Sequence, residues 1–171
     1  MTTFLRKFNQ KLNRDIRYGV FQDGMVKTDD DIDWSRYKTI PITLFPKVKA
    51  GTCWDFVNFE HNFFKVNDIP HNCYLFVSEA DDGSTVTHTF IIFQYGKNEY
   101  WFESAWKKYQ GIHTINGLHT IIQRLQKTYG KHTYDILLYN PDGLDAFLTG
   151  KEFMDQIYKT GKFVKRMANL K

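Results

Sequence analysis

The 171-residue sequence has little cysteine and no long apolar run. Its two cysteines, Cys53 and Cys73, are too few for the disulfide framework of a small secreted domain. Residues 1–17 have no uninterrupted apolar stretch of the roughly 7 to 15 residues that a signal peptide requires. No segment approaches the about 20 apolar residues that cross a bilayer. We therefore expect a soluble, cytoplasmic protein with no membrane partner.

Repeats, low-complexity tracts and long Pro/Ser/Gly linkers are also missing from the sequence. The length suits one hydrophobic core rather than two. Hydrophobic residues make up 42% of the chain and aromatic residues 17%, which is more than a disordered chain carries. We expect residues 1–171 to form a single domain with an aromatic-rich core.

Metal-binding spacings are absent as well, since no HxH or HExxH pattern occurs. We therefore predict no metal and no cofactor. The net charge of +4 is modest, and the one basic concentration lies in residues 159–171. Such an end is typical of a solvated helix face, so we expect no nucleic-acid partner; binding of nucleic acid there is the weakest of three functional hypotheses.

Apolar spacing divides the chain into alternating helices and strands, which predicts an α+β fold. A helix with an apolar stripe should begin the chain, a polar loop should follow at 23–35, and the segment 37–49, with two prolines, should be extended. The further predictions are a helix over 53–66, strands over 73–78, 87–95 and 99–105 in an antiparallel meander, a helix over 117–129, a strand over 134–139 and a helix over 144–167 interrupted near Gly161.

Cys53 follows the turn Ala50-Gly51-Thr52, and Thr52 is suited to cap a helix. Cys53 would then lie in the first turn of a buried helix. A thiol is a useful nucleophile only as thiolate, which a helix N-terminus and a neighbouring imidazolium both favour. Cys73 lacks such surroundings, so we interpret it as a packing residue.

His88 falls in the predicted strand 87–95, which has bulky residues of both parities. That pattern is typical of a central strand covered on both faces. There His88 is placed to act as general base for a thiol and then to return the proton to a leaving group. An imidazole in this role needs a third group to orient it, and Glu103 on the next predicted strand supplies a carboxylate.

Three segments carry a resemblance to a known family: Gly51-Thr52-Cys53-Trp54-Asp55-Phe56, then His88-Thr89-Phe90, then Tyr100-Trp101-Phe102-Glu103-Ser104-Ala105-Trp106. Their order and spacing resemble the transglutaminase-like, papain-related superfamily, over about a third of the chain. The resemblance implies a catalytic helix packed on a central antiparallel sheet with flanking helices. It also implies peptide hydrolysis, deamidation or acyl transfer through a thioester on Cys53, with Cys53, His88 and Glu103 as the catalytic triad.

The sequence departs from the family pattern at two places. The acidic member is usually Asp in that superfamily, whereas Glu103 is one methylene longer. Papain-like peptidases place a Gln shortly before the nucleophile to line the oxyanion hole, but the nearest Gln here is Gln22. The backbone N–H of Cys53, with Gln22 or Trp54, is the alternative oxyanion donor set. Trp54 and Trp106 are predicted to lie around the active cleft.

The expected strand register argues against Glu103 as the carboxylate that orients His88. A turn at residues 96–98 puts Tyr95 opposite Glu99, and hence His88 opposite Trp106 rather than Glu103. Direct pairing of His88 with Glu103 needs a bulge or a shifted turn. The competing carboxylates are Glu99, Glu79 and Asp55.

These observations favour a cysteine hydrolase or acyltransferase with a peptide or protein substrate. The second hypothesis is a non-catalytic binding module that retains the fold and uses its aromatic cleft or basic tail. The sequence specifies neither the amide bond that is attacked nor the oligomeric state.

Overall fold

The computed structural model describes residues 3–28, 31–79, 83–129 and 134–166. Its centre is a six-stranded sheet in the order β10-β9-β5-β6-β7-β8, in which every neighbouring pair is antiparallel. The predicted α+β class and antiparallel sheet are therefore confirmed. The strands of this sheet are β5 (His71–Glu79), β6 (Thr85–Tyr95), β7 (Asn98–Glu103), β8 (Gly111–Ile115), β9 (Tyr134–Tyr139) and β10 (Lys162–Arg166).

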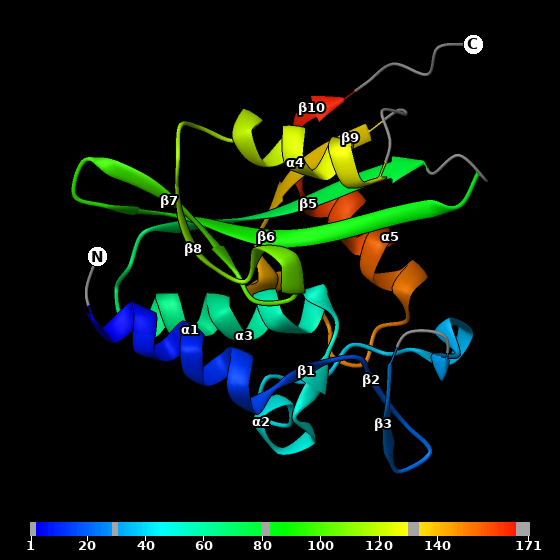
Figure 1. The fold of residues 1–171 in the computed structure, drawn as a ribbon. Helices are drawn as coiled ribbons and strands as arrows, with labels where there is room; N and C mark the ends of the chain where they lie inside the picture. The colour runs from blue at the N-terminus through cyan, green and yellow to red at the C-terminus, as the bar shows by residue number, and fades with distance from the viewer. Residues whose placement is uncertain (1–2, 29–30, 80–82, 130–133, 167–171) are drawn as a thin grey trace.

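Helices lie on both faces of the sheet, with α4 on one side and α1 and α3 on the other (Figure 1). Two short strand pairs lie beside the helices: β1 runs parallel to β4, and β2 runs antiparallel to β3. The helices are α1 (Thr3–Asp15), α2 (Phe45–Val48), α3 (Cys53–Val66), α4 (His119–Tyr129) and α5 (Gly150–Thr160), with 3-10 turns η2 (Trp34–Arg36), η3 (Lys107–Tyr109) and η4 (Pro141–Gly143); the short strands are β1 (Arg17–Tyr18), β2 (Val20–Gln22), β3 (Met25–Lys27) and β4 (Ala50–Gly51).

Two apolar clusters fill the space between the sheet and its helices. On one face, Val57 and Phe64 of α3 and Phe153 of α5 pack with strand residues such as Ile91. On the other face, Ile121 of α4 packs with strand residues of the opposite parity. Because both faces of β6 are covered, its six residues 88–93 are all buried, as the pattern of bulky residues predicts.

The α3 helix begins where the sequence predicts. Asp55, at the third helical position, accepts a hydrogen bond from the backbone N–H of Thr52 at 2.8 Å, which satisfies an N–H group before the first turn. Gly51 precedes this cap, and a Cβ there would lie 2.4 Å from the ring of Phe45 and 2.8 Å from the Cβ of Asp55. Only glycine therefore lets the chain turn into α3 against these neighbours.

Three segment predictions are wrong in part. Residues 37–49 are not a strand, because Pro46 is accommodated in the first turn of α2. The helix predicted over 144–167 begins only at Gly150 and stops at Thr160, and the chain beyond Gly161 becomes β10, which pairs with the free edge of β9. The loop predicted at 23–35 contains β3; Asp29 and Asp30 lie outside the described residues. None of the described helices is long and apolar enough to span a bilayer.

Candidate active site

Cys53 occupies the first position of α3, as predicted. Its side chain is only 5% exposed. It belongs to an apolar cluster that joins the start of α3 to the end of α1 and to the segment after β7. The unpaired N–H groups and the dipole of the helix N-terminus both favour negative charge at this position.

His88 lies on β6, beyond the last residue of that strand that pairs with β7. The pairing of β6 with β7 runs from Tyr95 opposite Asn98 to Ile91 opposite Phe102. The predicted register, with Tyr95 opposite Glu99, is thus wrong by one residue. Beyond Ile91 no β7 residue pairs with β6 within the described chain, which leaves room beside His88 for side chains that arrive from other elements.

Glu103, the last residue of β7, reaches His88 although the two are not opposite each other in the ladder. Its Oε2 atom lies 2.8 Å from Nε2 of His88, and its Oε1 atom accepts a hydrogen bond from the backbone N–H of Trp106 at 2.8 Å. The carboxylate is 2% exposed. The chain bends directly after Glu103, so the departure from the strand, not a bulge within it, brings the carboxylate to the imidazole.

Cys53 lies near this pair, and its side chain is one of the groups that raise the pKa of His88. Because Nε2 of His88 faces Glu103, Nδ1 is the nitrogen left for the thiol. Burial lowers the pKa of His88, but the Glu103 carboxylate and the Cys53 thiol outweigh this effect and raise it to about 10. His88 therefore carries a proton at neutral pH, beside a carboxylate and near a thiol.

The competing carboxylates lie in other positions. Asp55 is buried at the cap of α3, where it accepts hydrogen bonds from the backbone N–H of Ile40 and the hydroxyl of Tyr37 at 2.6 and 2.8 Å. Burial raises the pKa of Asp55 to about 6, against the opposing effect of these hydrogen bonds. Glu99 pairs with Gln94 near the hairpin turn, and Glu79 ends β5.

The three residues that the sequence predicts for the cleft and the oxyanion hole lie in different surroundings. Trp106 lies beside the triad, with its ring centroid 5.5 Å from that of His88. Trp54 points into the core, where it stacks on Phe153 at a centroid distance of 4.3 Å. Gln22 is buried in β2, and both ends of its amide bond the backbone of Asp33, at 2.7 and 3.3 Å. The structure thus brings Trp106 to the triad, and it directs Trp54 and Gln22 elsewhere.

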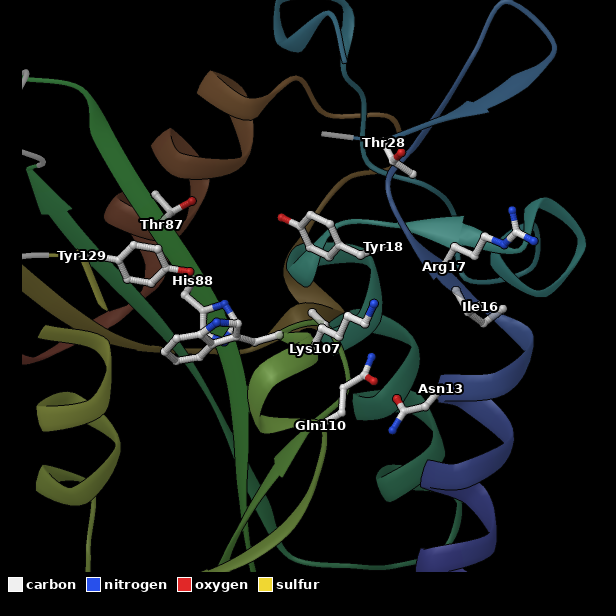
Figure 2. A pocket seen from close by; sticks show the side chains of 12 residues that line it. Asn13, Ile16, Arg17, Tyr18, Thr28, Thr87, His88, Lys107, Gln110 and Tyr129 are labelled. Atoms are coloured by element: carbon white, nitrogen blue, oxygen red, sulfur yellow. The ribbon is translucent and has the colours of Figure 1, made fainter. Parts of the chain in front are cut away.

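A pocket of about 560 Å³ opens over His88 (Figure 2). Figure 2 shows Tyr18 and Tyr129 on either side of the space above His88, with Asn13 and Gln110 facing each other at its other end. Cys53 does not line this pocket, but it packs in the same cluster as Ile16 and Ala105, which do. The lining residues are Asn13, Ile16, Arg17, Tyr18, Thr28, Thr87, His88, Ala105, Trp106, Lys107, Gln110 and Tyr129.

Sequence reasoning missed most of this lining. Tyr18 is in a two-residue strand, β1, that pairs with Gly51 just before the nucleophile. A strand this short leaves no periodic signal in the sequence. Tyr129 does have a signal, because it is the last inward aromatic residue of the predicted helix over 117–129. Burial raises the pKa of Tyr129 to about 12, with smaller contributions from Cys53 and Glu103, which places its hydroxyl near the triad.

A second layer of polar residues, also missed, supports Glu103 from behind. The Asn9 side chain donates to the backbone carbonyl of Glu103 and to the hydroxyl of Ser104, both at 3.3 Å. Glu60 of α3, which is 1% exposed, lies near Ser104 in the same layer. Burial raises the pKa of Glu60 well above its usual range. The layer ties α1 and α3 to the turn that follows β7.

The second cysteine has different surroundings. Cys73 lies inside β5 and is 2% exposed. Burial raises the pKa of its thiol well above the usual range, with smaller effects from Glu60 and Asp142. Beside it lie His61 of α3 and His71 of β5, so the described residues hold one group of three possible metal ligands.

Comparison with protein-family models, with curated proteins and with solved structures finds no match to this chain. The residues themselves, together with their geometry, therefore carry the functional argument.

Proposed function

We propose that this protein is a cysteine-dependent hydrolase or acyltransferase that acts on peptide or other amide bonds, as its resemblance to the transglutaminase-like, papain-related superfamily implies. One observation carries the proposal: the buried His88 contacts the Glu103 carboxylate at 2.8 Å, and Cys53, at the first position of α3, is close enough to raise the pKa of its imidazole. Nucleophile, base and orienting group are then in the order that thiol-dependent acyl transfer requires.

The first half of the reaction forms a thioester. The Cys53 thiolate, paired with the protonated His88, attacks the carbonyl carbon of the amide. His88 then gives the proton to the nitrogen of the leaving amine as the C–N bond breaks. Glu103 holds the imidazole in position, because its other oxygen is held by the backbone N–H of Trp106.

The second half releases the acyl group. Water, or the amine of a second substrate, gives a proton to His88 while it attacks the thioester carbonyl. The C–S bond breaks, Cys53 leaves as the thiolate, and His88 keeps the proton, which restores the starting pair. Attack by water gives hydrolysis or deamidation, and attack by an amine gives acyl transfer.

The oxyanion that forms in each half needs hydrogen-bond donors. The backbone N–H of Cys53 is suited to this, since the first N–H groups of a helix have no partner within the helix. Gln22 and Trp54 are directed elsewhere, as described above. The Tyr18 hydroxyl is the better second donor, because Tyr18 lies over the pocket next to Gly51 and close to the nucleophile.

The pocket also bears on the class of substrate. Apart from His88, the charged residues among those lining the pocket are Arg17 and Lys107, and both are basic. A substrate with acidic or carbonyl-rich groups near the scissile amide fits such a surface. A peptide or protein segment provides these groups.

Acylation of the full-length protein by p-nitrophenyl acetate tests the proposal without knowledge of the natural substrate. We expect a burst of nitrophenol with one acetyl group on Cys53, found by mass spectrometry of the digested protein. Cys53→Ala should abolish the burst. Cys73 is the internal control: it should take up iodoacetamide much more slowly than Cys53 in the same sample, since burial keeps it a neutral thiol.

Equal and slow modification of both cysteines would contradict the proposal. In that case the non-catalytic binding module is the better hypothesis, and Cys53→Ser should leave partner binding intact. Its structural support is that the pocket is lined by His88 and aromatic residues rather than by Cys53 itself.

A further inference from the structure

A second cluster of nitrogen and sulfur ligands lies farther along α3, about 12 Å from Cys53 by the helical rise over eight residues. It consists of His61 from α3 with His71 and Cys73 from β5, and we call it the His61 cluster. One potential ligand atom from each residue lies within 4.8 Å of the others. Neither the triad nor the pocket over His88 includes any of the three.

Two distances describe the inside of the His61 cluster. Nδ1 of His61 lies 2.8 Å from Nε2 of His71. The same Nδ1 atom lies 3.7 Å from Sγ of Cys73. Both histidines therefore turn one ring nitrogen toward a common centre beside the thiol.

In each histidine, the ring nitrogen that faces away from the other ring is called the outer nitrogen. It lies beside an oxygen atom that can only accept hydrogen bonds. Nε2 of His61 lies 3.2 Å from the Asp142 carboxylate, and Nδ1 of His71 lies 2.7 Å from the backbone carbonyl of Ile69. Each outer nitrogen must then carry the ring's hydrogen. Imidazoles that bind metals are held in the same way, by an outer N–H that donates to a carboxylate or a carbonyl.

The inner nitrogens follow from this assignment. When both outer nitrogens carry hydrogen, the inner nitrogens of two neutral rings present lone pairs to each other at 2.8 Å. Such a pair repels unless a proton or a metal ion lies between or beside the two nitrogens. The Cys73 sulfur, next to one of them, adds a third electron-pair donor at the same place.

We propose that His61, His71 and Cys73 bind a divalent transition-metal ion, with zinc the best fit to two imidazoles and one thiolate. Zinc binds nitrogen at about 2.0–2.1 Å and sulfur at about 2.3 Å. In a tetrahedral site these lengths separate two nitrogens by about 3.3 Å and a nitrogen from a sulfur by about 3.6 Å. The imidazoles would move apart by about half an ångström, and the sulfur is already at about the required distance from Nδ1 of His61.

A fourth position remains for water or a small ligand. The three residues line a pocket of about 350 Å³ together with Leu138, Asn140 and other residues of the β9 end. The metal would therefore have a path from solvent and an exchangeable coordination position. Three protein ligands with an open fourth position are typical of zinc sites that hold a reactive water.

The test uses full-length Cys53→Ala protein treated with a chelator, so that Cys73 is the one thiol left. Titration with Co²⁺ should give the intense near-ultraviolet absorption of a thiolate–cobalt bond at one ion per chain, and Zn²⁺ should displace it. Because this measurement needs no change in the His61 cluster, it does not depend on the folding of a cluster variant. Absence of the thiolate band at stoichiometric Co²⁺ would overturn the proposal.

Variants in the same Cys53→Ala background sharpen the test. Loss of a residue that hydrogen bonds to a metal ligand weakens metal binding by about 10- to 100-fold. Asp142→Asn, which removes such a residue, should weaken Zn²⁺ binding by about 10-fold. His71→Gln and Cys73→Ser remove a ligand itself and should weaken it by at least about 100-fold. His119→Gln, which removes an exposed histidine of α4, is the matched control and should bind like the background protein. Equal affinity in all four variants would mean that the ion binds elsewhere, and the assignment would be wrong.

Discussion

The two ends of α3 each hold a cysteine, histidine and a carboxylate, yet they are arranged for different chemistry. At the start of the helix, His88 contacts Glu103 and lies near Cys53. Farther along, two imidazoles face each other beside Cys73. The first arrangement suits the proton transfer proposed for Cys53 and His88, whereas the second suits the cation binding proposed for the His61 cluster.

The carboxylates show the difference most clearly. Glu103 is 2% exposed and touches the imidazole as its direct ionic partner. The Asp142 side chain is 44% exposed and is shared between His61 and Lys65. A buried carboxylate strongly changes the pKa of its imidazole, while one in contact with water mainly orients the ring.

The largest expected effect is on acylation activity, which should depend on His88 and not on the His61 cluster. His88→Ala should lower the rate of acylation by p-nitrophenyl acetate about 10²- to 10⁴-fold, because the imidazolium that stabilises the attacking thiolate is lost. His71→Ala, the matched change in the His61 cluster, should leave this rate unchanged. Stopped-flow absorbance of nitrophenol release measures both. Equal losses in the two variants would show that the clusters do not act separately.

The second prediction compares the two carboxylates by stability. Glu103→Ala leaves a buried imidazolium without its partner and should cost about 3–5 kcal/mol of unfolding free energy. Asp142→Ala removes a half-exposed partner and should cost about 0.2–1 kcal/mol. Urea unfolding followed by tryptophan fluorescence gives both values. Similar costs for the two variants would mean that burial does not distinguish these pairs.

The third prediction tests whether the start of α3 can be weakened without loss of the His61 cluster. Asp55→Ala removes the acceptor for Thr52, Ile40 and Tyr37 and should cost about 2 kcal/mol. The Zn²⁺ affinity of the folded variant should not change. Glu152→Ala, in the exposed capping box of α5, is the matched control and should cost less, about 0.5–1 kcal/mol. Joint loss of both properties would show that the two ends of the helix are coupled.

The last prediction concerns pH. The folded-state pKa of His88, about 10, lies above the ordinary value of about 6.5, so folding takes up a proton. This stabilisation is complete below pH 6.5 and is lost as the pH rises toward 10, with a slope of at most about 1.4 kcal/mol per pH unit. His88→Gln should lose the slope between pH 7 and 9.5, and His71→Gln should keep it. Urea midpoints across this range provide the measurement, and a slope that persists in His88→Gln would assign it to another group.

Local patterns in the sequence were enough for the parts of the site that one element determines. The start of α3 follows from a cap residue before a run without glycine or proline, so Cys53 could be placed. The buried β6 strand follows from bulky residues of both parities, so His88 could be placed. Register could not be derived in this way: the hairpin turn is one residue shorter than expected, and the bend after Glu103 leaves no periodic signal.

The His61 cluster shows the same limit. The sequence has no HxH or HExxH spacing and therefore predicted no metal, because those patterns describe ligands on a single element. His61 and His71 meet only because the chain turns back between α3 and β5, with the turn at Ile69 holding the second ring.

The sequence alone thus determined which segments are helix or strand and where Cys53 and His88 lie within them, since these depend on the spacing of neighbouring residues. The tertiary structure decided that Glu103 reaches His88, that Gln22 and Trp54 point elsewhere, and that Cys73 joins two histidines. Those outcomes depend on the direction in which separate elements pack, and each is set by contacts between residues far apart in the chain.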